Sequence, residues 1–542
     1  MSTSISTTTG TGLHGVVRST TADEYAAVRA VFARHAAPLQ EGAVSVVFAY
    51  PGHGVGERHP QLSGCTSQML LLSNASAGLS RLGIGVAAAS TEPPGNHAHL
   101  GALSRVIARF TEEEAAAVPH TDLPEGRFLT RWTMVFGGPR DGLLITDITD
   151  SVAHTRAVID LLTADRLREW TAAAGADPSA APADVTAAYA NGADSLGIVA
   201  FDAGTPLVAK TGPAEVIDAE TAFVAEVNTL LADRDLPPLF PRLYSVHRAG
   251  AQATSLMEQV EPLTLDHVVF EDRAKFVLTK DAVPALEPHL RLLGELYAVT
   301  TEQRRPTVAD YLLRERFHAV RKHEGFVSTL TAFFPDWDPA RMLDADVVLP
   351  TGARLPGYTR TTRWLDGVAE SLLPGSGCLV HGDVHLKNML RRQDGSPVFV
   401  DPRTVWDGRD RPDIGFGDPS YDFATLLHSA LPMSGLLQAI ADGTSESLLP
   451  NMPAAPDRVL DLSELTTPFV VDPGLRSLED RLLALLGTRD DPPVLRARLY
   501  IGAANALVGW LKYERALATP RAWLAVYAYV LWYLDRARTE LR

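Results

Sequence analysis

Apolar and polar residues follow a mixed strand and helix pattern in the first third of the chain. Short β-branched or aromatic runs at residues 44–50 (VSVVFAY) and 83–89 predict buried strands, and residues 67–82 between them predict a helix. A Gly-Gly-Pro-Arg-Asp-Gly turn at 137–142 is typical of a hairpin, and residues 152–170 then predict a second long helix. This order of strand, helix, strand, hairpin and helix predicts an α/β or α+β domain.

A different pattern follows. Residues 172–190 are rich in Ala, Pro, Asp and Gly and predict a linker. Strand-like runs at 196–201, 206–209 and 255–258 come next, and the chain is then mainly helical to its end. Residues 431–468 carry Pro, Gly, Ser and Asp clusters and are interpreted as a long loop or a helical insertion. The pattern predicts a small β-rich lobe followed by a larger helical lobe.

Length and charge narrow the function classes. At about 150 residues per domain, 542 residues correspond to three or four domains. Apolar residues make up 46% of the chain and charged residues 21%, which is ordinary for a globular protein. The formal charge of −16 argues against nucleic acid as a partner, because such binding needs clustered Lys and Arg. An acidic surface tolerates a cationic small molecule.

Cysteine usage and the absence of long apolar runs favour a cytoplasmic protein. Cys65 and Cys378 are the only cysteines, too few for a disulfide framework or a Cys-rich zinc site, and they suit a reducing compartment. Residues 1–12 show no signal peptide, and the apolar run 500–511 is too short to span a bilayer. We therefore expect no membrane partner.

The strongest chemical signal is the segment LVHGDVHLKNMLRRQDGSPVFVD at residues 379–401. Asp383 and Asn388 are five positions apart, and Asp401 ends a second strand-like run. Phosphoryl transfer from a nucleotide needs one carboxylate to orient the attacking hydroxyl, and an amide oxygen with another carboxylate to hold Mg²⁺. An alternative is a metal site of another kind built on the alternating His381, Asp383 and His385.

This segment resembles the catalytic core of the aminoglycoside phosphotransferase and choline kinase-like superfamily, whose loop runs H-G-D-x-x-x-x-N. The later FGDPSYDFA at residues 416–424 resembles the start of a helix in that family. The resemblance implies a bilobal protein-kinase-like fold, ATP and Mg²⁺ as cofactors, and the hydroxyl group of a small molecule as acceptor. It implies these roles for individual residues: Asp383 as catalytic base, Asn388 and Asp401 as Mg²⁺ ligands, and His381, His385, Asp418 and Asp422 as structural support of the loop.

The β-rich lobe is expected to supply a nucleotide clamp. Leu-Val-Ala-Lys ends on Lys210 and resembles the kinase strand whose lysine contacts the α- and β-phosphates. Glu220 and Glu226 are candidates to pair with Lys210, and spacing favours Glu226. Glu258 and Val260 lie in a segment that resembles the hinge facing the adenine edge.

Two departures from the protein-kinase pattern favour a small-molecule kinase. The chain has no G-x-G-x-x-G before the first strand of this lobe, and Asp401 is followed by Pro402 and Arg403 in place of Phe-Gly. The acceptor is expected to be an aminoglycoside, amino sugar, cyclitol or related compound, with an amine-bearing acceptor left open. Phosphorylation of protein and a binding-only role of a kinase fold are the alternatives.

A second signal lies in the first domain. Gly-Cys-Thr-Ser-Gln, with Cys65, stands at a predicted helix start, where unpaired N–H groups and the helix dipole stabilise a thiolate. The surrounding YPGHG and GCTSQ resemble the peroxiredoxin branch of the thioredoxin-like fold, and Arg131 resembles the arginine that steadies the thiolate. Leu62 stands where that family has Thr or Ser, and there is no second cysteine nearby. Peroxiredoxin-like domains often pair, so a homodimer through this domain is one option.

The predicted organisation therefore has five parts: an extension at 1–37, a peroxiredoxin-like domain at 38–170, a linker at 171–190, a kinase-like β-rich lobe at 191–262 and a helical lobe at 263–542. The predicted function is ATP- and Mg²⁺-dependent O-phosphotransfer to a small molecule. The alternative is a thiol peroxidase or redox sensor that uses Cys65, with the kinase module subordinate.

Overall fold

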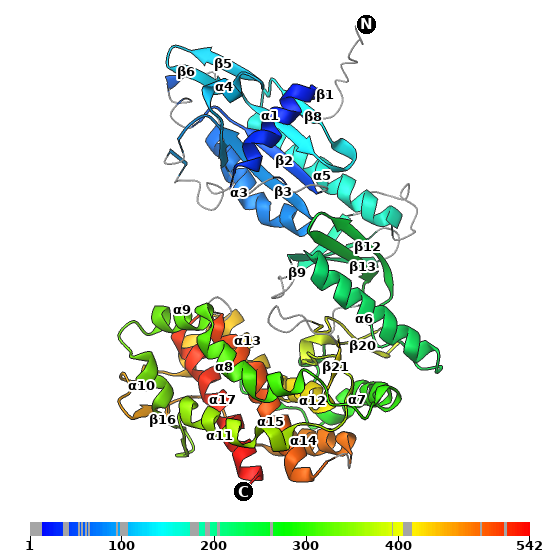
Figure 1. The fold of residues 1–542 in the computed structure, drawn as a ribbon, viewed down its shortest axis with the longest axis vertical. Coiled ribbons are helices and arrows are strands. Elements are labelled where there is room, and N and C mark those ends of the chain that lie inside the picture. Colours follow the sequence, from blue (N-terminus) through cyan, green and yellow to red (C-terminus); the bar gives the residue numbers. More distant parts are fainter. Residues whose placement is uncertain are drawn as a thin grey trace. The chain divides into compact units, whose positions relative to one another are not determined.

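The chain forms two compact units in the computed structural model (Figure 1): residues 1–221 with 242–259, and residues 222–241 with 260–542. The structure describes residues 13–542 except 36–38, 40–42, 53–54, 56–57, 60–61, 63–64, 94–95, 98–106, 174–183, 190–195, 203–205, 261–263, 393, 405–412, 414, 488–489 and 514–516. Residues 1–12 of the predicted extension and residues 174–183 and 190 of the predicted linker lie outside the described residues. Residues 13–35, which were predicted as part of the extension, instead belong to the first unit, because Val16–Ser19 is a strand that pairs with Leu143–Thr146.

The first unit begins with a six-stranded sheet in the order β1-β8-β7-β2-β3-β4. Its strands are β1 (Val16–Ser19), β2 (Val44–Ala49), β3 (Ile84–Ser90), β4 (Ile107–Arg109), β7 (Trp132–Phe136) and β8 (Leu143–Thr146). The helices are α1 (Ala22–Ala33), α3 (Cys65–Arg81), α4 (Glu112–Ala115) and α5 (Ser151–Ala173), and β5 (His120–Leu123) pairs with β6 (Gly126–Leu129). β2 runs parallel to β3 and antiparallel to β7, which confirms the predicted strand, helix, strand and hairpin order.

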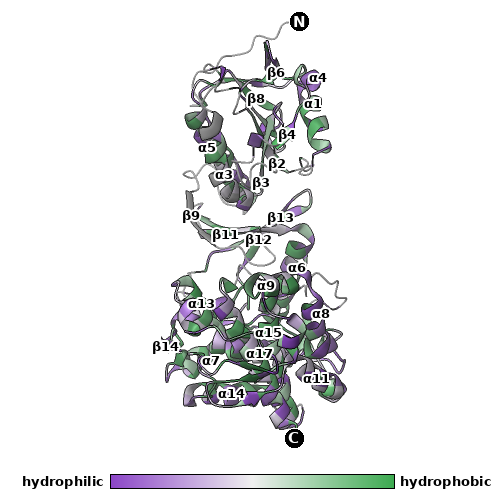
Figure 2. Cartoon of the chain, turned by 90° about the vertical axis from the view of Figure 1, so that its left-hand side faces the viewer, coloured by the Kyte–Doolittle hydropathy of each residue, from purple (hydrophilic) through white to green (hydrophobic). Residues whose placement is uncertain are grey.

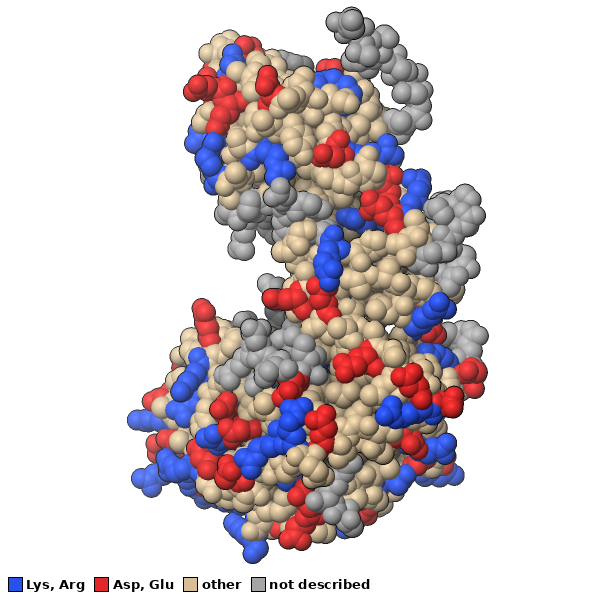
Figure 3. All heavy atoms as spheres, turned by 45° about the vertical axis from the view of Figure 1, so that its right-hand side comes forward, with Lys and Arg blue, Asp and Glu red and all other residues tan. Residues whose placement is uncertain are grey.

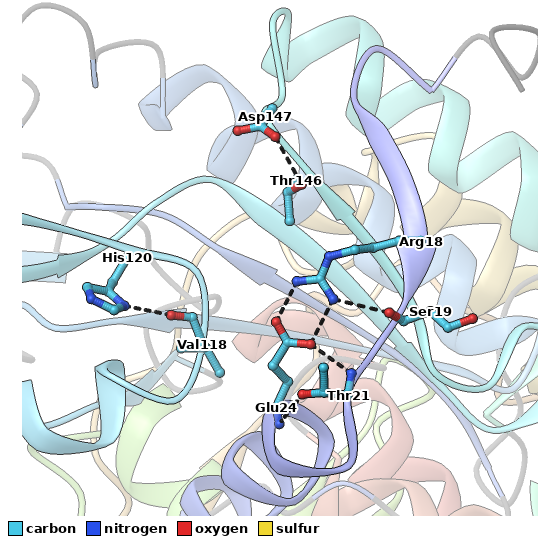
Figure 4. Close-up of polar contacts among 8 residues, drawn as sticks. All are labelled: Arg18, Ser19, Thr21, Glu24, Val118, His120, Thr146 and Asp147. Atoms are coloured by element: carbon cyan, nitrogen blue, oxygen red, sulfur yellow. Dashed lines mark hydrogen bonds and ion pairs between the residues drawn. The ribbon is translucent and has the colours of Figure 1, made fainter. Parts of the chain in front are cut away.

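The start of α1 is fixed by a charged capping box (Figure 4). Thr21 accepts a hydrogen bond from the backbone N–H of Glu24 at 3.2 Å, and the Glu24 carboxylate accepts one from the Thr21 N–H at 2.8 Å. Arg18 donates to the same carboxylate at 2.8 Å and holds the pKa of Glu24 below its ordinary value. These bonds satisfy N–H groups that a helix start otherwise leaves without partners.

A second, five-stranded sheet completes the first unit in the order β12-β13-β11-β10-β9. It contains β9 (Asp184–Tyr189), β10 (Gly197–Asp202), β11 (Pro206–Pro213), β12 (Leu243–Ala249) and β13 (Gln252–Glu258), all antiparallel to their neighbours. The strands expected at 196–201, 206–209 and 255–258 are therefore present. Part of the predicted linker is in fact the edge strand β9, because its backbone pairs with β10 in spite of a composition poor in large apolar residues.

The two sheets of the first unit share one hydrophobic core. Trp170 of α5 is almost fully buried and contacts Phe201 of β10, with ring centroids 5.9 Å apart. Leu207 and Ala209 of β11 and Leu256 of β13 belong to the same buried cluster as the residues of β2, β3, α3 and α5. The five-stranded sheet therefore packs through one of its faces on the N-terminal part of the unit, which contains β2, β3, α3 and α5.

The second unit is mainly helical, as the pattern predicted. Its helices are the second part of α6 (Ala214–Ala232), α7 (Ala282–Thr300), α8 (Arg316–Lys322), α9 (Glu324–Phe333), α10 (Pro339–Asp344), α11 (Tyr358–Leu372), α12 (Pro419–His428), α13 (Ser434–Ala441), α14 (Pro473–Leu486), α15 (Pro492–Val508) and α17 (Pro520–Glu540). Its strands are short: β14 (Phe270–Asp272), β15 (Val277–Leu278), β16 (Asp346–Val348), β17 (Arg354–Leu355), β18 (Cys378–Leu379), β19 (Met389–Arg391), β20 (Pro397–Phe399), β21 (Phe416–Gly417) and β22 (Val459–Asp461).

The core of the second unit is built around α12, α15 and α17, and Figure 2 shows α15 and α17 side by side in the middle of this unit. All ten residues of α12 are buried, and Trp523, Tyr527 and Tyr533 of α17 have no exposed surface. The helical stretch Pro419–Ala441 is long and apolar enough to cross a membrane, but 83% of its apolar window is buried inside the protein, as in the core helix of a globular domain. Residues 431–468, interpreted as a loop or helical insertion, contain α13 and β22.

Charged residues of both signs are interspersed on the surface (Figure 3). Lys and Arg stand next to Asp and Glu over the face shown. Ion pairs of the described residues include Arg127 with Asp122 and Arg304 with Asp413. A nucleic-acid site needs a continuous basic stripe. The absence of nucleic acid as a partner stays a prediction.

Candidate functional site

The HGD loop, residues 381–388, connects β18 to β19 and carries most of the predicted chemistry. Its last residues, Leu386–Asn388, form one 3-10 turn that leads into β19. Gly382 has a φ of +81°, a conformation that residues with a side chain adopt only at a cost. Glycine at this position is therefore required by the path of the backbone.

One buried carboxylate holds this loop. Asp422, in the first turn of α12, accepts hydrogen bonds from the backbone N–H groups of His381 at 2.8 Å and Gly382 at 2.6 Å. The hydroxyl of Tyr297 on α7 donates a third bond at 2.7 Å. Burial raises the pKa of Asp422 to about 6, although these three donors favour the ionised form. Asp418 caps the same helix by accepting from the Ser420 N–H at 3.0 Å.

His381 is a neutral structural part of the loop. Its Nε2 lies 3.0 Å from the Val400 carbonyl oxygen and therefore donates, while its Nδ1 accepts from the Asp383 N–H at 3.2 Å. The ring packs between Phe240 and Phe399, with centroids 5.7 and 5.6 Å away. Burial lowers its pKa to about 4. This bonding pattern fixes one tautomer and ties the loop to the end of β20.

Asp383 is ionised in spite of its burial. Burial opposes the charge, but the guanidinium of Arg403 favours it, and the pKa of Asp383 is lowered as a result. The backbone N–H of Arg403 also donates to the His381 carbonyl at 2.8 Å. This bond keeps Arg403 beside the HGD loop. A carboxylate with such a low pKa is suited to accept a hydrogen bond from a hydroxyl group.

Asn388 and Asp401 are brought together by the β19–β20 hairpin. Val400, the neighbour of Asp401, donates its N–H to the Asn388 carbonyl at 3.0 Å. The side-chain amide nitrogen of Asn388 donates to the Asp383 carbonyl at 3.1 Å, so the amide oxygen is not used in this bond. Asp401 is exposed and has a φ of +61°, an uncommon backbone conformation of the kind that clusters at functional sites.

These residues fit a hard divalent cation. An amide oxygen and a carboxylate are the ligand types that Mg²⁺ prefers, and a site of this kind is completed by water and phosphate oxygens. Among the described residues there is no group of three or more His, Cys, Asp or Glu side chains that could hold a metal ion. The alternative of a metal site on His381, Asp383 and His385 is therefore not formed, because His381 uses both ring nitrogens within the protein.

Lys210 forms a buried ion pair with Glu220. The Nζ of Lys210 on β11 lies 2.6 Å from Oε2 of Glu220 on α6, and both side chains are less than 10% exposed. The preference for Glu226 is wrong. Glu226 is exposed, because six residues further along an α-helix the side chain has rotated by about 120° from the face that Glu220 occupies.

The predicted hinge residues lie at the end of β13. Glu258 is the last residue of β13, and its carboxylate accepts from the Arg242 N–H at 3.0 Å. Val260 follows two residues later and is partly exposed. Their predicted role toward an adenine edge stays a prediction.

The structure describes the surroundings of Cys65 only in part. Cys65 is the first residue of α3, as the sequence predicted, and its side chain lies outside the described residues. Arg131 is partly exposed and immediately precedes β7. Cys378, the other cysteine, is buried in β18, as expected for a small apolar core residue.

Three residues of the site had not been identified from the sequence: Tyr297, Arg403 and His428. His428 is buried at the end of α12, and burial lowers its pKa to about 4. Arg403 follows Asp401 by two positions and could have been noticed by that spacing. Tyr297 and His428 carried no signal, since only the fold brings α7 and α12 to the loop.

Residues 188–455, slightly less than half of the chain, match the model of the phosphotransferase enzyme family. No curated protein gives a significant match. Among solved structures, a protein assigned as a fructosamine-3-kinase from Haemophilus somnus 129PT is 9% identical, with 69% of this chain and 95% of that chain covered and a TM-score of 0.34. The APH(2″)-IIa complex with gentamicin is 13% identical over 64% and 91% of the two chains, with a TM-score of 0.32.

An aminoglycoside-3′-phosphotransferase of type VIII is 15% identical over 56% of this chain and 93% of that chain, with a TM-score of 0.27. At these scores the solved structures carry no conclusion, and the family match supports a kinase-like character for residues 188–455.

The ion pair can be tested by a matched pair of substitutions on one helix. Glu220→Gln leaves the buried Lys210 charge without its carboxylate, so we expect a loss of about 3–5 kcal/mol in the free energy of unfolding. Glu226→Gln, at an exposed position, should change it by no more than about 0.5 kcal/mol. Urea titration followed by circular dichroism measures both, and equal effects would contradict the assignment.

Buried histidines make the second unit sensitive to acid. Burial lowers the pKa values of His289, His381 and His428 to about 4, from an ordinary value of 6.5. Below pH 6.5 the unfolded chain binds protons that the folded state excludes, so stability falls as the pH drops toward 4. Asp422, with a pKa of about 6, acts in the opposite sense between pH 6 and 3.8.

We expect a net loss of several kcal/mol in the free energy of unfolding between pH 7 and pH 5, since each histidine contributes roughly 2 kcal/mol and Asp422 offsets only part. Urea unfolding at both pH values, followed by tryptophan fluorescence, measures this loss. His289→Gln should reduce this loss by the contribution of one histidine, roughly 2 kcal/mol. A free energy that is independent of pH over this range is the contrary result.

Proposed function

We propose that the chain is an ATP- and Mg²⁺-dependent O-phosphotransferase that transfers the γ-phosphoryl group to a hydroxyl of a small molecule. The observation that carries the proposal is the HGD loop together with the β19–β20 hairpin. Asn388 donates to the Asp383 carbonyl, and its own carbonyl accepts from the N–H of Val400, the neighbour of Asp401. The family match of residues 188–455 supports the same reaction class.

The role proposed for Asp383 is to orient the acceptor hydroxyl and take its proton. Its pKa is lowered, so it is ionised at neutral pH and accepts a hydrogen bond from a hydroxyl. The transition state of phosphoryl transfer is loose, and most of the rate comes from positioning and charge stabilisation. A weak but fixed base suffices in such a reaction.

Asn388 and Asp401 would hold Mg²⁺ when nucleotide is bound. The ion supplies charge neutralisation at the phosphate oxygens. The protein contributes the fixed positions of the two ligands, which the hairpin bonds between β19 and β20 maintain. His381, Asp418 and Asp422 keep the loop in place without contacting the reactants.

Lys210 is proposed to bind the nucleotide phosphates. Its ion pair with Glu220 fixes the lysine side chain in one orientation, as a phosphate contact requires. Glu258 and Val260 are proposed to meet the adenine edge through their backbone groups. These assignments rest on the sequence resemblance and on the position of each residue in its own strand.

The acceptor is proposed to be a small molecule such as an aminoglycoside, amino sugar or cyclitol. The missing glycine-rich motif and the Pro402–Arg403 pair after Asp401 speak against protein as substrate. An amine-bearing acceptor would suit the acidic net charge of −16. Mass spectrometry of a panel of these compounds after incubation with Mg-ATP identifies the acceptor by the added phosphate.

Asp383→Asn is the decisive variant. It keeps the size of the side chain but removes the charge that orients the hydroxyl, so we expect kcat to fall by about 10²–10⁴-fold with little change in KM for ATP. Steady-state kinetics with the acceptor found in the panel measure this. Asp394→Asn, at an exposed position in the same hairpin, is the matched control and should keep the wild-type rate. Turnover by Asp383→Asn at the wild-type rate would contradict the role proposed for Asp383.

A second function is proposed for the first unit, a thiol peroxidase or redox sensor based on Cys65. The observation that favours it is topological: α3 begins at Cys65 and follows β2, and β3 and the antiparallel β7–β8 pair complete the sheet around it. A strand, helix, strand and antiparallel pair is the arrangement expected of a thioredoxin-like core. The N-terminus of α3 would lower the pKa of a thiol there.

For this second function, wild-type protein should consume hydrogen peroxide in the presence of a thiol reductant, and Cys65→Ser should not. Cys378→Ser, which changes the other cysteine, should keep the activity because that thiol is buried in β18. Equal peroxide consumption by Cys65→Ser and wild type excludes a peroxidatic role of Cys65. Arg131→Gln is expected to slow the reaction without abolishing it.

A further inference from the structure

The first unit contains a cavity of about 630 Å³ that the proposed reactions do not use. Its lining comes from β2, the α3–β3 turn and α5 on one side and from β11, β12 and β13 on the other. Figure 1 shows α5 next to β12 and β13, where these walls approach each other. A volume of this size is in the range of small-molecule sites.

The walls are apolar at one side and polar at the other. Val44, Leu82 and Trp170 supply the apolar surface. Thr211 and Thr254 line the opposite side, on neighbouring strands, with their hydroxyl oxygens 2.9 Å apart. An apolar surface with a few converging polar groups is typical of a ligand site.

Arg166 is the central charged residue of the cavity. Its Nη1 donates to Glu169 at 2.8 Å and its Nη2 donates to the Gly83 carbonyl at 3.4 Å, a long bond. Its Nε is buried and has no hydrogen-bond partner. A buried N–H group without a partner costs about 1–3 kcal/mol, so its presence in a native fold needs an explanation.

The Arg166 charge is also poorly compensated. Burial lowers its pKa, although Glu169 favours the charged form. Arg248, which lines the same cavity, has its pKa raised by Asp218. Only 12% of the Arg166 side chain is exposed, so water does little to stabilise the guanidinium group. A second negative group near Arg166 would compensate the part of the guanidinium charge that Glu169 alone does not compensate.

His247 provides a second buried polar atom at the same place. Its Nε2 is buried and has no hydrogen-bond partner. Burial lowers the pKa of His247, and both Glu169 and Arg166 are close enough to influence it, so the ring is neutral at pH 7. A neutral imidazole can donate one hydrogen bond to an acceptor without adding charge.

We propose that this cavity binds a small organic anion, a molecule with a carboxylate, phosphate or sulfonate group and an apolar body. The anionic group pairs with Arg166 and accepts from His247, and the body lies against Val44, Leu82 and Trp170. Arg166 has two competing anions in this arrangement, the ligand and Glu169. The proposal does not depend on phosphotransfer or on Cys65.

The cavity lies on the face of β11 opposite to Lys210. Successive side chains of a strand point to opposite faces, so Thr211 faces the cavity while Lys210 pairs with Glu220 on the other side. The proposed ligand site is therefore separate from the phosphate-binding role assigned to Lys210.

Anilinonaphthalene sulfonate is a suitable probe, since it joins a sulfonate to an aromatic body and fluoresces in apolar surroundings. Titration of the full-length protein, by fluorescence and by calorimetry for stoichiometry, should show one saturable site. Arg166→Gln should weaken binding by about tenfold, because a charge-assisted hydrogen bond is lost. Glu169→Gln should tighten binding by about threefold, because it removes the competing carboxylate.

Two controls separate this site from unspecific binding or damage to the fold. Arg156→Gln changes an exposed arginine on the same helix and should leave affinity unchanged. Ala173→Trp places a large side chain in the wall and should abolish the saturable site, which keeps the test valid if Arg166→Gln fails to fold. Circular dichroism melting curves check each variant.

The opposite signs expected for Arg166→Gln and Glu169→Gln cannot result from a general loss of structure. Equal affinity of the wild type, Arg166→Gln and Ala173→Trp would overturn the proposal. Weaker binding of the probe by Glu169→Gln would overturn the claim that the anionic group pairs with Arg166 in competition with Glu169.

Discussion

The structure of the candidate phosphotransfer site depends on one buried carboxylate, that of Asp422. Two consecutive backbone N–H groups, of His381 and Gly382, donate to it, and the Tyr297 hydroxyl adds a third bond. Because Gly382 has a positive φ, the loop turns sharply here and presents Asp383. The same carboxylate sits in the first turn of α12, whose residues are all buried. A fully buried helix of the second unit thus determines where the reactive loop lies.

Burial has opposite consequences for the groups around this loop. It holds His381 and His428 neutral and raises the pKa of Asp422, while the guanidinium of Arg403 lowers the pKa of Asp383 against the effect of burial. Electrostatic preorganisation of this kind lets a site stabilise charge without rearranging solvent. The same burial makes the fold sensitive to acid. Unfolding lets the buried neutral histidines take up protons, so a lower pH favours the unfolded state.

The two faces of the five-stranded sheet have different contacts. One face carries Lys210 and its partner Glu220, and the other packs on α3 and α5 through Leu207, Ala209 and Leu256. The N-terminal part of the first unit therefore belongs to the core that supports this sheet. The cavity around Arg166 lies where this packing is incomplete.

The sequence by itself determined the order of elements and the reactive loop. Local periodicity predicted β2, α3, β3 and α5, and the spacing of Asp383, Asn388 and Asp401 indicated their chemistry, because these signals lie within short stretches of chain. Only the tertiary structure decided between Glu220 and Glu226, since the choice depends on helix rotation against β11. It alone brought Tyr297, Arg403 and His428 to the loop and made β9 an edge strand, because long-range packing and strand pairing leave no local pattern.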